Sequence, residues 1–123
     1  MKTILIVEDH TSIRENISEI LELKGYIILV AKNGKTGLAM AKDKKPDIIL
    51  CDVLMPEMDG YQVFRCLKDN PDTLNIPFIF VTGSASKQDI EDGLNAGADA
   101  YITKPFDGDE LYAAIERCFK PEV

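Results

Sequence analysis

Residues 47–60 of the chain read DIILCDVLMPEMDG, and this stretch decides the fold class. Its first five residues predict a strand, and residues 48–51 are apolar without the alternation typical of a strand that has one face in water. Such strands occur in parallel sheets whose two faces are both covered by helices. The strand is followed by Asp52 and by a loop with Pro56 and Gly60, after which a helical pattern begins. The stretch therefore predicts a parallel α/β protein.

Outward from this stretch, strand-like and helix-like patterns alternate along the whole chain. Further strands are predicted at residues 3–7, 26–31, 77–81 and 100–102, and each is followed by apolar residues at helical spacing. Helix starts are predicted at Ser12-x-x-Glu15, Ser86-x-x-Asp89 and Asp107-x-x-Glu110. Five successive β-α units with right-handed crossovers predict a doubly wound, three-layer α/β domain.

Composition narrows the class of protein further. The chain has 123 residues, a length that suits one domain, and no boundary is visible within it. With 14 Lys and Arg against 21 Asp and Glu, its formal charge is −7, which disfavours direct binding to nucleic acid or to a membrane surface. Three cysteines without C-x-x-C spacing argue against disulfides and zinc and favour a cytoplasmic location. The first apolar run, residues 4–7, is too short for a signal peptide or a membrane span.

Polar residues follow four of the five predicted strands. Glu8 and Asp9 follow the first, Asp52 the third, Thr82 the fourth and Lys104 the fifth. Strands often end in polar residues because the chain turns at the surface, so one such residue alone means little. In a doubly wound sheet, however, ligands bind beyond the carboxyl ends of the strands, where all five residues are expected to converge.

The residue types at these ends point to phosphoryl chemistry. Three crowded carboxylates repel one another unless a proton, a lysine or a cation relieves them. Oxygen ligands of this kind suit Mg²⁺, for which Mn²⁺ can substitute, while Lys104 and the Thr82 hydroxyl can hold a second anion. A carboxylate in that setting can attack a phosphoryl group and form an aspartyl phosphate.

Four segments carry a resemblance to a known family. They read ILIVED at residues 4–9, PDIILCDVLMPEMDG at 46–60, IFVTG at 79–83 and GADAYITKPF at 97–106. Together they span almost the whole chain, and each resembles the corresponding part of the receiver domain of two-component response regulators. The resemblance implies a flavodoxin-like (βα)5 fold with strand order 2-1-3-4-5. It also implies one receiver domain over residues 1–123, with no output domain in this chain.

The resemblance also implies roles for the residues at the strand ends. Asp52 would be the phosphoryl acceptor and one of the metal ligands. Asp9 would bind Mg²⁺ directly, Glu8 would hold it through water, and the backbone carbonyl of Leu54 would complete the protein's share of the ligands. The apolar Leu54 side chain cannot orient a water molecule, so we expect a long-lived phosphoryl group.

The same resemblance implies a conformational switch in the chain and the proteins with which the chain would interact. Thr82 and Lys104 would bind phosphoryl oxygens, with a cis Lys104–Pro105 peptide, and Thr82 would form a switch pair with Tyr101. The donor would be the phosphohistidine of a sensor histidine kinase or of a histidine phosphotransfer protein. The chain would be a switch that promotes its own phosphorylation and slow dephosphorylation, not a turnover enzyme. The face formed by the fourth helix, fifth strand and fifth helix would dock a downstream protein or a second phosphorylated copy.

Three other classes of protein share parts of this sequence pattern. An FMN-binding domain needs a phosphate loop after the first strand, where Glu8 and Asp9 would repel the phosphate. A haloacid-dehalogenase-type phosphatase needs a second acid two residues after its nucleophile, where this chain has Leu54. The third rival, a receiver-like module that acts by protein contact without phosphorylation, stays open.

Overall fold

The computed structural model of the protein describes residues 1–83 and 86–119. Five strands form one parallel sheet in the order β2-β1-β3-β4-β5. In chain order the elements are β1 (Thr3–Val7), α1 (Thr11–Leu23), β2 (Ile27–Ala31), α2 (Gly34–Lys44), β3 (Ile48–Cys51), α3 (Gly60–Lys68), β4 (Phe78–Thr82), α4 (Lys87–Asn95), β5 (Ala100–Thr103) and α5 (Gly108–Phe119). The predicted flavodoxin-like fold and strand order are confirmed.

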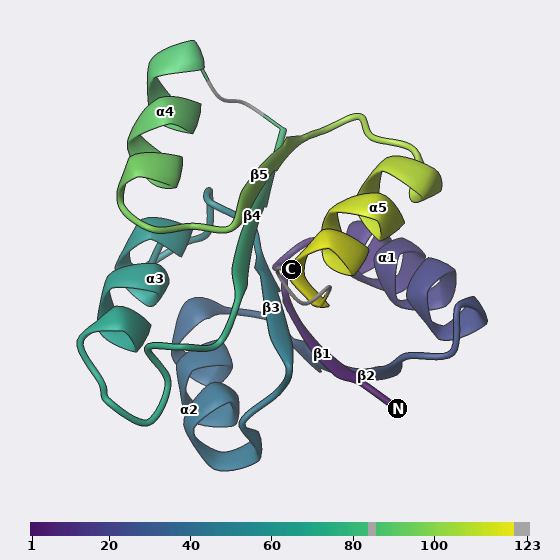
Figure 1. Ribbon diagram of the computed structural model, residues 1–123, viewed down its shortest axis with the longest axis horizontal. Helices are drawn as coiled ribbons and strands as arrows, with labels where there is room; N and C mark the ends of the chain where they lie inside the picture. The colour runs from purple at the N-terminus through teal and green to yellow at the C-terminus, as the bar shows by residue number, and fades with distance from the viewer. Residues whose placement is uncertain (84–85, 120–123) are drawn as a thin grey trace.

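Helices cover both faces of the sheet (Figure 1). On one side lie α2, α3 and α4, and on the other lie α1 and α5. Each face has its own apolar core: Leu5, Ile49, Phe78 and Phe80 point to the first side, and Ile4, Ile6, Leu50 and Ile79 point to the second. The fully apolar runs of β1, β3 and β4 are explained by this double coverage.

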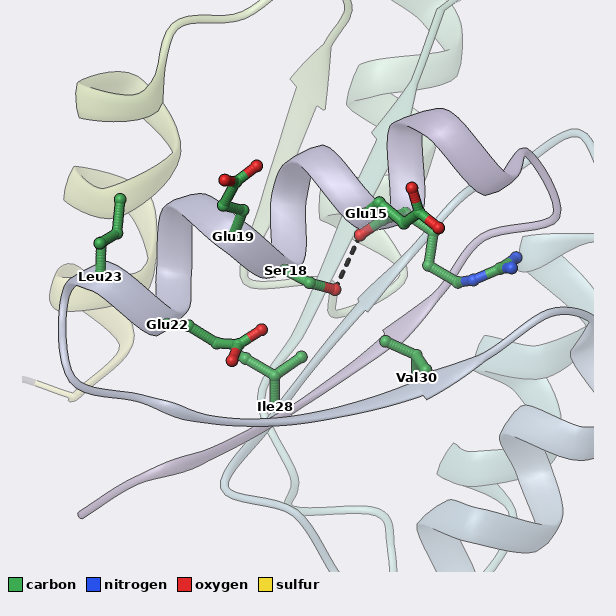
Figure 2. A pocket seen from close by; sticks show the side chains of 8 residues that line it. Glu15, Ser18, Glu19, Glu22, Leu23, Ile28 and Val30 are labelled. Atoms are coloured by element: carbon green, nitrogen blue, oxygen red, sulfur yellow. Dashed lines mark hydrogen bonds between the residues drawn. The ribbon is translucent and has the colours of Figure 1, made fainter.

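The edge strand β2 differs from the central strands. Ile27 is 46% exposed and Val30 is 44% exposed, whereas every residue of β3 is buried. Between α1 and β2 lies a groove that Glu15, Glu19 and Glu22 line on the helix side, and Ile28 and Val30 on the strand side (Figure 2). None of the predicted site residues lines this groove.

Two of the three predicted helix starts are confirmed, and one is wrong. Ser86 and Asp89 form a reciprocal capping box at α4, and Asp107 accepts a 2.6 Å hydrogen bond from the backbone N–H of Glu110 at α5. The helix α1 instead begins at Thr11, with His10 as an N-cap that makes no side-chain capping bond. The predicted Ser12 cap therefore lies inside the helix, because the chain turns into α1 directly after the acidic residues that follow β1.

The loop between β3 and α3 brings two segments close together. A Cβ atom on Gly60 would clash with the backbone carbonyl oxygen of Asp52 and would lie 2.9 Å from the Cα atom of Val53. The Gly60 N–H donates to the Val53 carbonyl at 2.8 Å, and α3 then starts with a capping box between Asp59 and Gln62. Glycine at this position thus allows the helix to start against the acidic end of β3.

Two further observations complete the fold. The Lys104–Pro105 peptide is cis, as the resemblance implied. Among the described residues, no helix has both the length and the apolar character needed to span a membrane.

Candidate functional site

Strand register places two of the acids side by side. Val7 is paired with Cys51, so the residues that follow β1 and β3 leave the sheet at the same level. The Asp52 N–H donates to the Val7 carbonyl at 2.9 Å, which continues the ladder one residue beyond β3. Glu8 and Asp52 consequently emerge next to each other from neighbouring strands, and both are buried.

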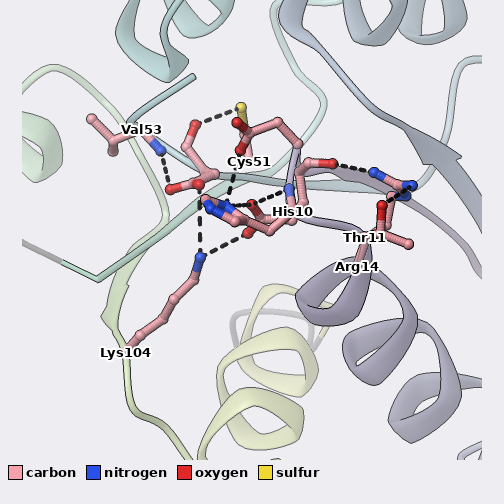
Figure 3. A network of polar contacts seen from close by, with 9 residues as sticks. His10, Thr11, Arg14, Cys51, Val53 and Lys104 are labelled. Atoms are coloured by element: carbon pink, nitrogen blue, oxygen red, sulfur yellow. Dashed lines mark hydrogen bonds and ion pairs between the residues drawn. The ribbon is translucent and has the colours of Figure 1, made fainter. Parts of the chain in front are cut away.

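Lys104 enters this acidic cluster from the loop after β5 (Figure 3). Its Nζ atom lies 2.7 Å from Glu8 Oε1 and 3.7 Å from Asp52 Oδ2. The other Asp52 oxygen, Oδ1, accepts a 2.8 Å hydrogen bond from the backbone N–H of Val53. The lysine therefore forms its short ion pair with Glu8, while one Asp52 oxygen keeps only a long contact.

Two buried oxygens at the site lack hydrogen-bond partners among the described residues. They are Thr82 Oγ1 and Asp9 Oδ1, although the latter lies within 3.3 Å of the Nδ1 atom of the exposed His10. Buried polar atoms without a partner are unusual, because each carries the cost of losing its water. An oxygen in this state is suited to receive a cation or to contact a ligand oxygen, so the Asp9 and Thr82 positions fit the predicted metal and phosphoryl sites.

The acidic cluster has the dimensions of a metal site. One ligand atom from each of Glu8, Asp9, His10 and Asp52 can be chosen so that all lie within 4.8 Å of one another. Carboxylate oxygens are the ligands that Mg²⁺ prefers in proteins. The nitrogen of His10 is a ligand that Mg²⁺ does not favour; its Nδ1 atom lies 3.3 Å from Asp9 Oδ1, and its side chain is 66% exposed.

Burial and charge shift two pKa values in opposite directions. Burial and the neighbouring Glu8 carboxylate raise the pKa of Asp52 to about 6, although Lys104 and the Val53 N–H act the other way. Burial also raises the pKa of Glu8, but the bonds to Lys104 and the neighbouring Asp52 outweigh it, so the Glu8 pKa lies below its ordinary value. Without a cation, Asp52 is thus the carboxyl group that most readily keeps its proton.

A small cavity of about 210 Å³ opens onto this cluster. Its lining includes Asp52, Thr82, Lys104, Gly83 and the side chain of Leu54, which is 63% exposed. Small molecules can therefore reach the buried Asp52 carboxylate from solvent, past Leu54.

The structure brings together most of the predicted site residues, but Tyr101 lies apart from them. Its hydroxyl is 2.6 Å from that of Tyr61 in α3, and its ring packs against Phe80. The Tyr61 contact joins residues 40 positions apart through their side chains, and no sequence pattern signals such a pair. Sequence reasoning therefore missed Tyr61.

Fold and site together define a doubly wound α/β protein with an acidic, lysine-containing pocket at the carboxyl ends of its strands. The sequence pattern of the response regulator receiver domain matches residues 4–116 of the chain. The chain therefore belongs to the response regulator receiver domain family. Members of this family are signalling switches of two-component systems, bind Mg²⁺ at an acidic pocket, and interact with histidine kinases and downstream effectors.

Curated relatives include proteins of different lengths. The chain is 44% identical over 115 residues to the phosphate regulon transcriptional regulatory protein PhoB of Pseudomonas aeruginosa, covering 94% of this chain and 50% of that protein. It is 38% identical over 115 residues to Protein PilH of the same organism, covering 94% of this chain and 95% of PilH. The chain thus spans about half the length of PhoB and nearly all of PilH.

Solved structures share the fold closely. The chemotaxis protein CheY4 of Vibrio cholerae superimposes with a TM-score of 0.90 at 29% sequence identity, over 97% of this chain and 99% of that one. The signal receiver domain of a signal transduction histidine kinase from Syntrophus aciditrophicus gives a TM-score of 0.87 at 37% identity, over 100% of this chain and 97% of that one.

Proposed function

We propose that the chain is a phosphorylation switch in which Asp52 accepts a phosphoryl group from a phosphohistidine. The donor is a sensor histidine kinase or a histidine phosphotransfer protein. The observation that carries this proposal is the setting of Asp52: a reachable carboxylate beside Lys104, with the unpartnered oxygens of Asp9 and Thr82 in the same site.

In the proposed transfer, an Asp52 carboxylate oxygen attacks phosphorus while the bond between phosphorus and the donor imidazole nitrogen breaks. The bonding electron pair stays on the imidazole nitrogen, and the ring leaves neutral because its other nitrogen already carries a proton; an aspartyl phosphate remains. Oδ2 is the better placed attacking atom, because Oδ1 is already bonded to the Val53 N–H. Lys104 and the Thr82 hydroxyl each donate a hydrogen bond to a phosphoryl oxygen, and the positive charge of Lys104 offsets its negative charge.

Glu8, Asp9, Asp52 and the Leu54 carbonyl would hold Mg²⁺, with Asp9 as a direct ligand and Glu8 acting through water. Bound Mg²⁺ supplies positive charge at the phosphoryl oxygens. Glu8 has a second task in this proposal, because its ion pair keeps Lys104 aimed at the site before the donor arrives.

The signal reaches the protein surface through movement of Thr82 towards the phosphoryl group. Thr82 lies at the end of β4, and its displacement makes room at Tyr101 in the neighbouring strand β5. The surface of α4, β5 and α5 then changes and binds a downstream protein or a second phosphorylated copy. We place this switch in the cytoplasm, as one receiver domain over residues 1–123.

Intact-mass measurement tests the acceptor assignment. The protein is incubated with Mg²⁺ and acetyl phosphate, and we expect the mass to rise by one phosphoryl group. Asp52→Asn should show no increase, because an amide cannot form the acyl phosphate. Omission of Mg²⁺ should strongly slow the reaction of the parent protein.

The matched control is Asp43→Asn, which makes the same chemical change at an exposed position of α2 and should leave the reaction intact. An increase that persists in Asp52→Asn would falsify the acceptor assignment. A parent protein that never gains mass, yet binds a partner regardless of phosphodonor, would instead favour the contact-only module.

A further inference from the structure

The switch tyrosine is held in a pocket made by three elements. Tyr101 in β5 is half-buried, and its ring centroid lies 5.2 Å from that of Phe80 in β4. The Phe80 ring lies 5.1 Å from that of Tyr61 in α3. The hydroxyl groups of Tyr61 and Tyr101 are 2.6 Å apart, so one donates to the other. Tyr101 therefore points inward, to the side of the sheet that α3 covers.

The helix α4 closes the pocket from the outside through Gly93. A Cβ atom at this position would lie 2.9 Å from Cδ2 and 3.0 Å from Cε2 of Tyr101, closer than packed carbons approach. Gly93 is the one buried residue of α4, although glycine is a poor helix former. Its lack of a side chain admits the inward Tyr101 ring.

The hydroxyl pair determines how firmly Tyr101 stays inward. Among the described residues, the Tyr101 hydroxyl has Tyr61 as its one hydrogen-bond partner. A half-buried hydroxyl that loses its partner bears part of its desolvation cost, and rotation into solvent relieves that cost. Removing the Tyr61 oxygen should thus favour the outward rotamer of Tyr101, while the ring at position 61 stays packed on Phe80.

We propose that Tyr61 is a positioning residue that holds Tyr101 inward before phosphorylation, in the space that Gly93 leaves. The effect of Tyr61 on signalling rests on the proposed function. If phosphorylation acts by favouring the inward rotamer of Tyr101, then Tyr61 shifts the unphosphorylated protein towards the switched conformation. By linkage, loss of the Tyr61 hydroxyl must then weaken binding of a phosphoryl group at Asp52.

The first measurement is ¹⁹F NMR of protein labelled with 3-fluorotyrosine, free of metal and phosphodonor. In Tyr61→Phe we expect the Tyr101 signal to move towards its solvent-exposed position and the outward population to rise about fivefold or more. Gly93→Ala should move the Tyr101 signal in the same direction although Tyr61 is intact. Alanine is a better helix former than glycine, so the substitution favours the helical backbone of α4.

The matched control is Tyr26→Phe, which removes a tyrosine hydroxyl that makes an equally short 2.6 Å bond, to Glu116 in α5. It should leave the Tyr101 signal unchanged. A Tyr101 signal that stays in place in Tyr61→Phe overturns the proposal, whatever Gly93→Ala does.

The second measurement is the affinity for beryllofluoride with Mg²⁺, used as a phosphoryl mimic at Asp52. We expect Tyr61→Phe to bind it more weakly, by the same factor by which the ¹⁹F signal shows the inward population to fall, and Tyr26→Phe to bind it like the parent. If Tyr61→Phe turns Tyr101 outward but binds beryllofluoride as tightly as the parent, the proposed coupling between Tyr101 and the Asp52 site is wrong. If no variant binds beryllofluoride, the proposed function fails, while the ¹⁹F signal still decides whether Tyr61 holds Tyr101.

Discussion

Differences between single atoms distinguish the acidic residues of the pocket from one another. Lys104 reaches both Glu8 and Asp52, but its short contact is with Glu8. This preference could not be predicted from the sequence, because all three residues stand at strand ends and the difference lies in side-chain geometry of about 1 Å. Their convergence, by contrast, followed from the rule that parallel strands end at one edge.

The raised pKa of Asp52 predicts that Asp52→Asn stabilises the metal-free protein near neutral pH. The folded protein holds the Asp52 proton up to about pH 6, and the unfolded chain releases it near the ordinary value of 3.8. The contribution of this group to stability is therefore full below pH 3.8 and is lost as the pH rises through about 6. At pH 7.5 the variant should gain at most about 3 kcal/mol in free energy of unfolding.

Urea unfolding in EDTA at pH 4 and pH 7.5 measures this effect. The advantage of Asp52→Asn should be small at the lower pH and large at the higher pH. An advantage that does not depend on pH would contradict the assignment of the raised pKa to Asp52.

Leu54 gives a second prediction at this scale, on the lifetime of the phosphoryl group. Leu54 lines the cavity over Asp52 and offers no polar atom on its side chain. Leu54→Asn or Leu54→Glu should speed dephosphorylation roughly tenfold, because a polar side chain there can orient the attacking water. Loss of the phosphoryl mass over time measures the rate. Leu23→Asn, at another exposed leucine, should leave it unchanged; equal rates in all variants would refute the role of Leu54.

At the scale of elements, the sequence predicted every strand and the two helix starts whose caps are local. Strands such as β3 and β4 are apolar throughout, and Ser86 and Asp107 cap their helices with their own neighbours. The predicted N-cap of α1 was wrong by two residues, Ser12 instead of His10, because the path of the chain after β1 and not a capping side chain sets the start of the helix. Contacts between distant side chains, such as Tyr61 with Tyr101, leave no periodic pattern.

The junction of β3 and α3 gives a prediction about Gly60. Gly60→Ala would force a methyl group against the Asp52 carbonyl, so we expect a loss of about 2–3 kcal/mol in stability and weaker Mg²⁺ binding. Gly108→Ala is the matched control, because its Cβ would lie 3.4 Å from the flexible Ile20 side chain. Thermal unfolding with and without Mg²⁺ compares the two. Similar behaviour of both variants would show that the close approach at Gly60 is unimportant.

For the whole molecule, we expect the acidic pocket to link stability to divalent cations. Burial and the Glu8 carboxylate disfavour the charged form of Asp52, and a cation bound beside the two would relieve this cost. A ligand that binds the folded state alone adds about 1.4 kcal/mol at ten times its Kd, which is a rise of roughly 5 °C in Tm for a domain of this size. We therefore expect Mg²⁺ to raise the Tm of the parent protein by such an amount.

Calorimetry of Asp9→Asn tests whether this rise depends on the proposed ligand. The Mg²⁺-dependent shift should largely disappear in Asp9→Asn and persist in Asp43→Asn, whose side chain is exposed on α2. A shift of equal size in both variants would mean that Mg²⁺ acts elsewhere on this acidic chain.

The shallow anchoring of α4 has a consequence for how such proteins diverge. Of its nine residues only Gly93 is buried, and Leu94 is 43% exposed. Substitutions at exposed positions usually change stability by less than about 0.5 kcal/mol. Most of this helix can therefore accept new side chains by mutation while the core and the acidic pocket stay intact. A lineage that duplicates the gene could retune partner choice on α4 alone, one surface residue at a time.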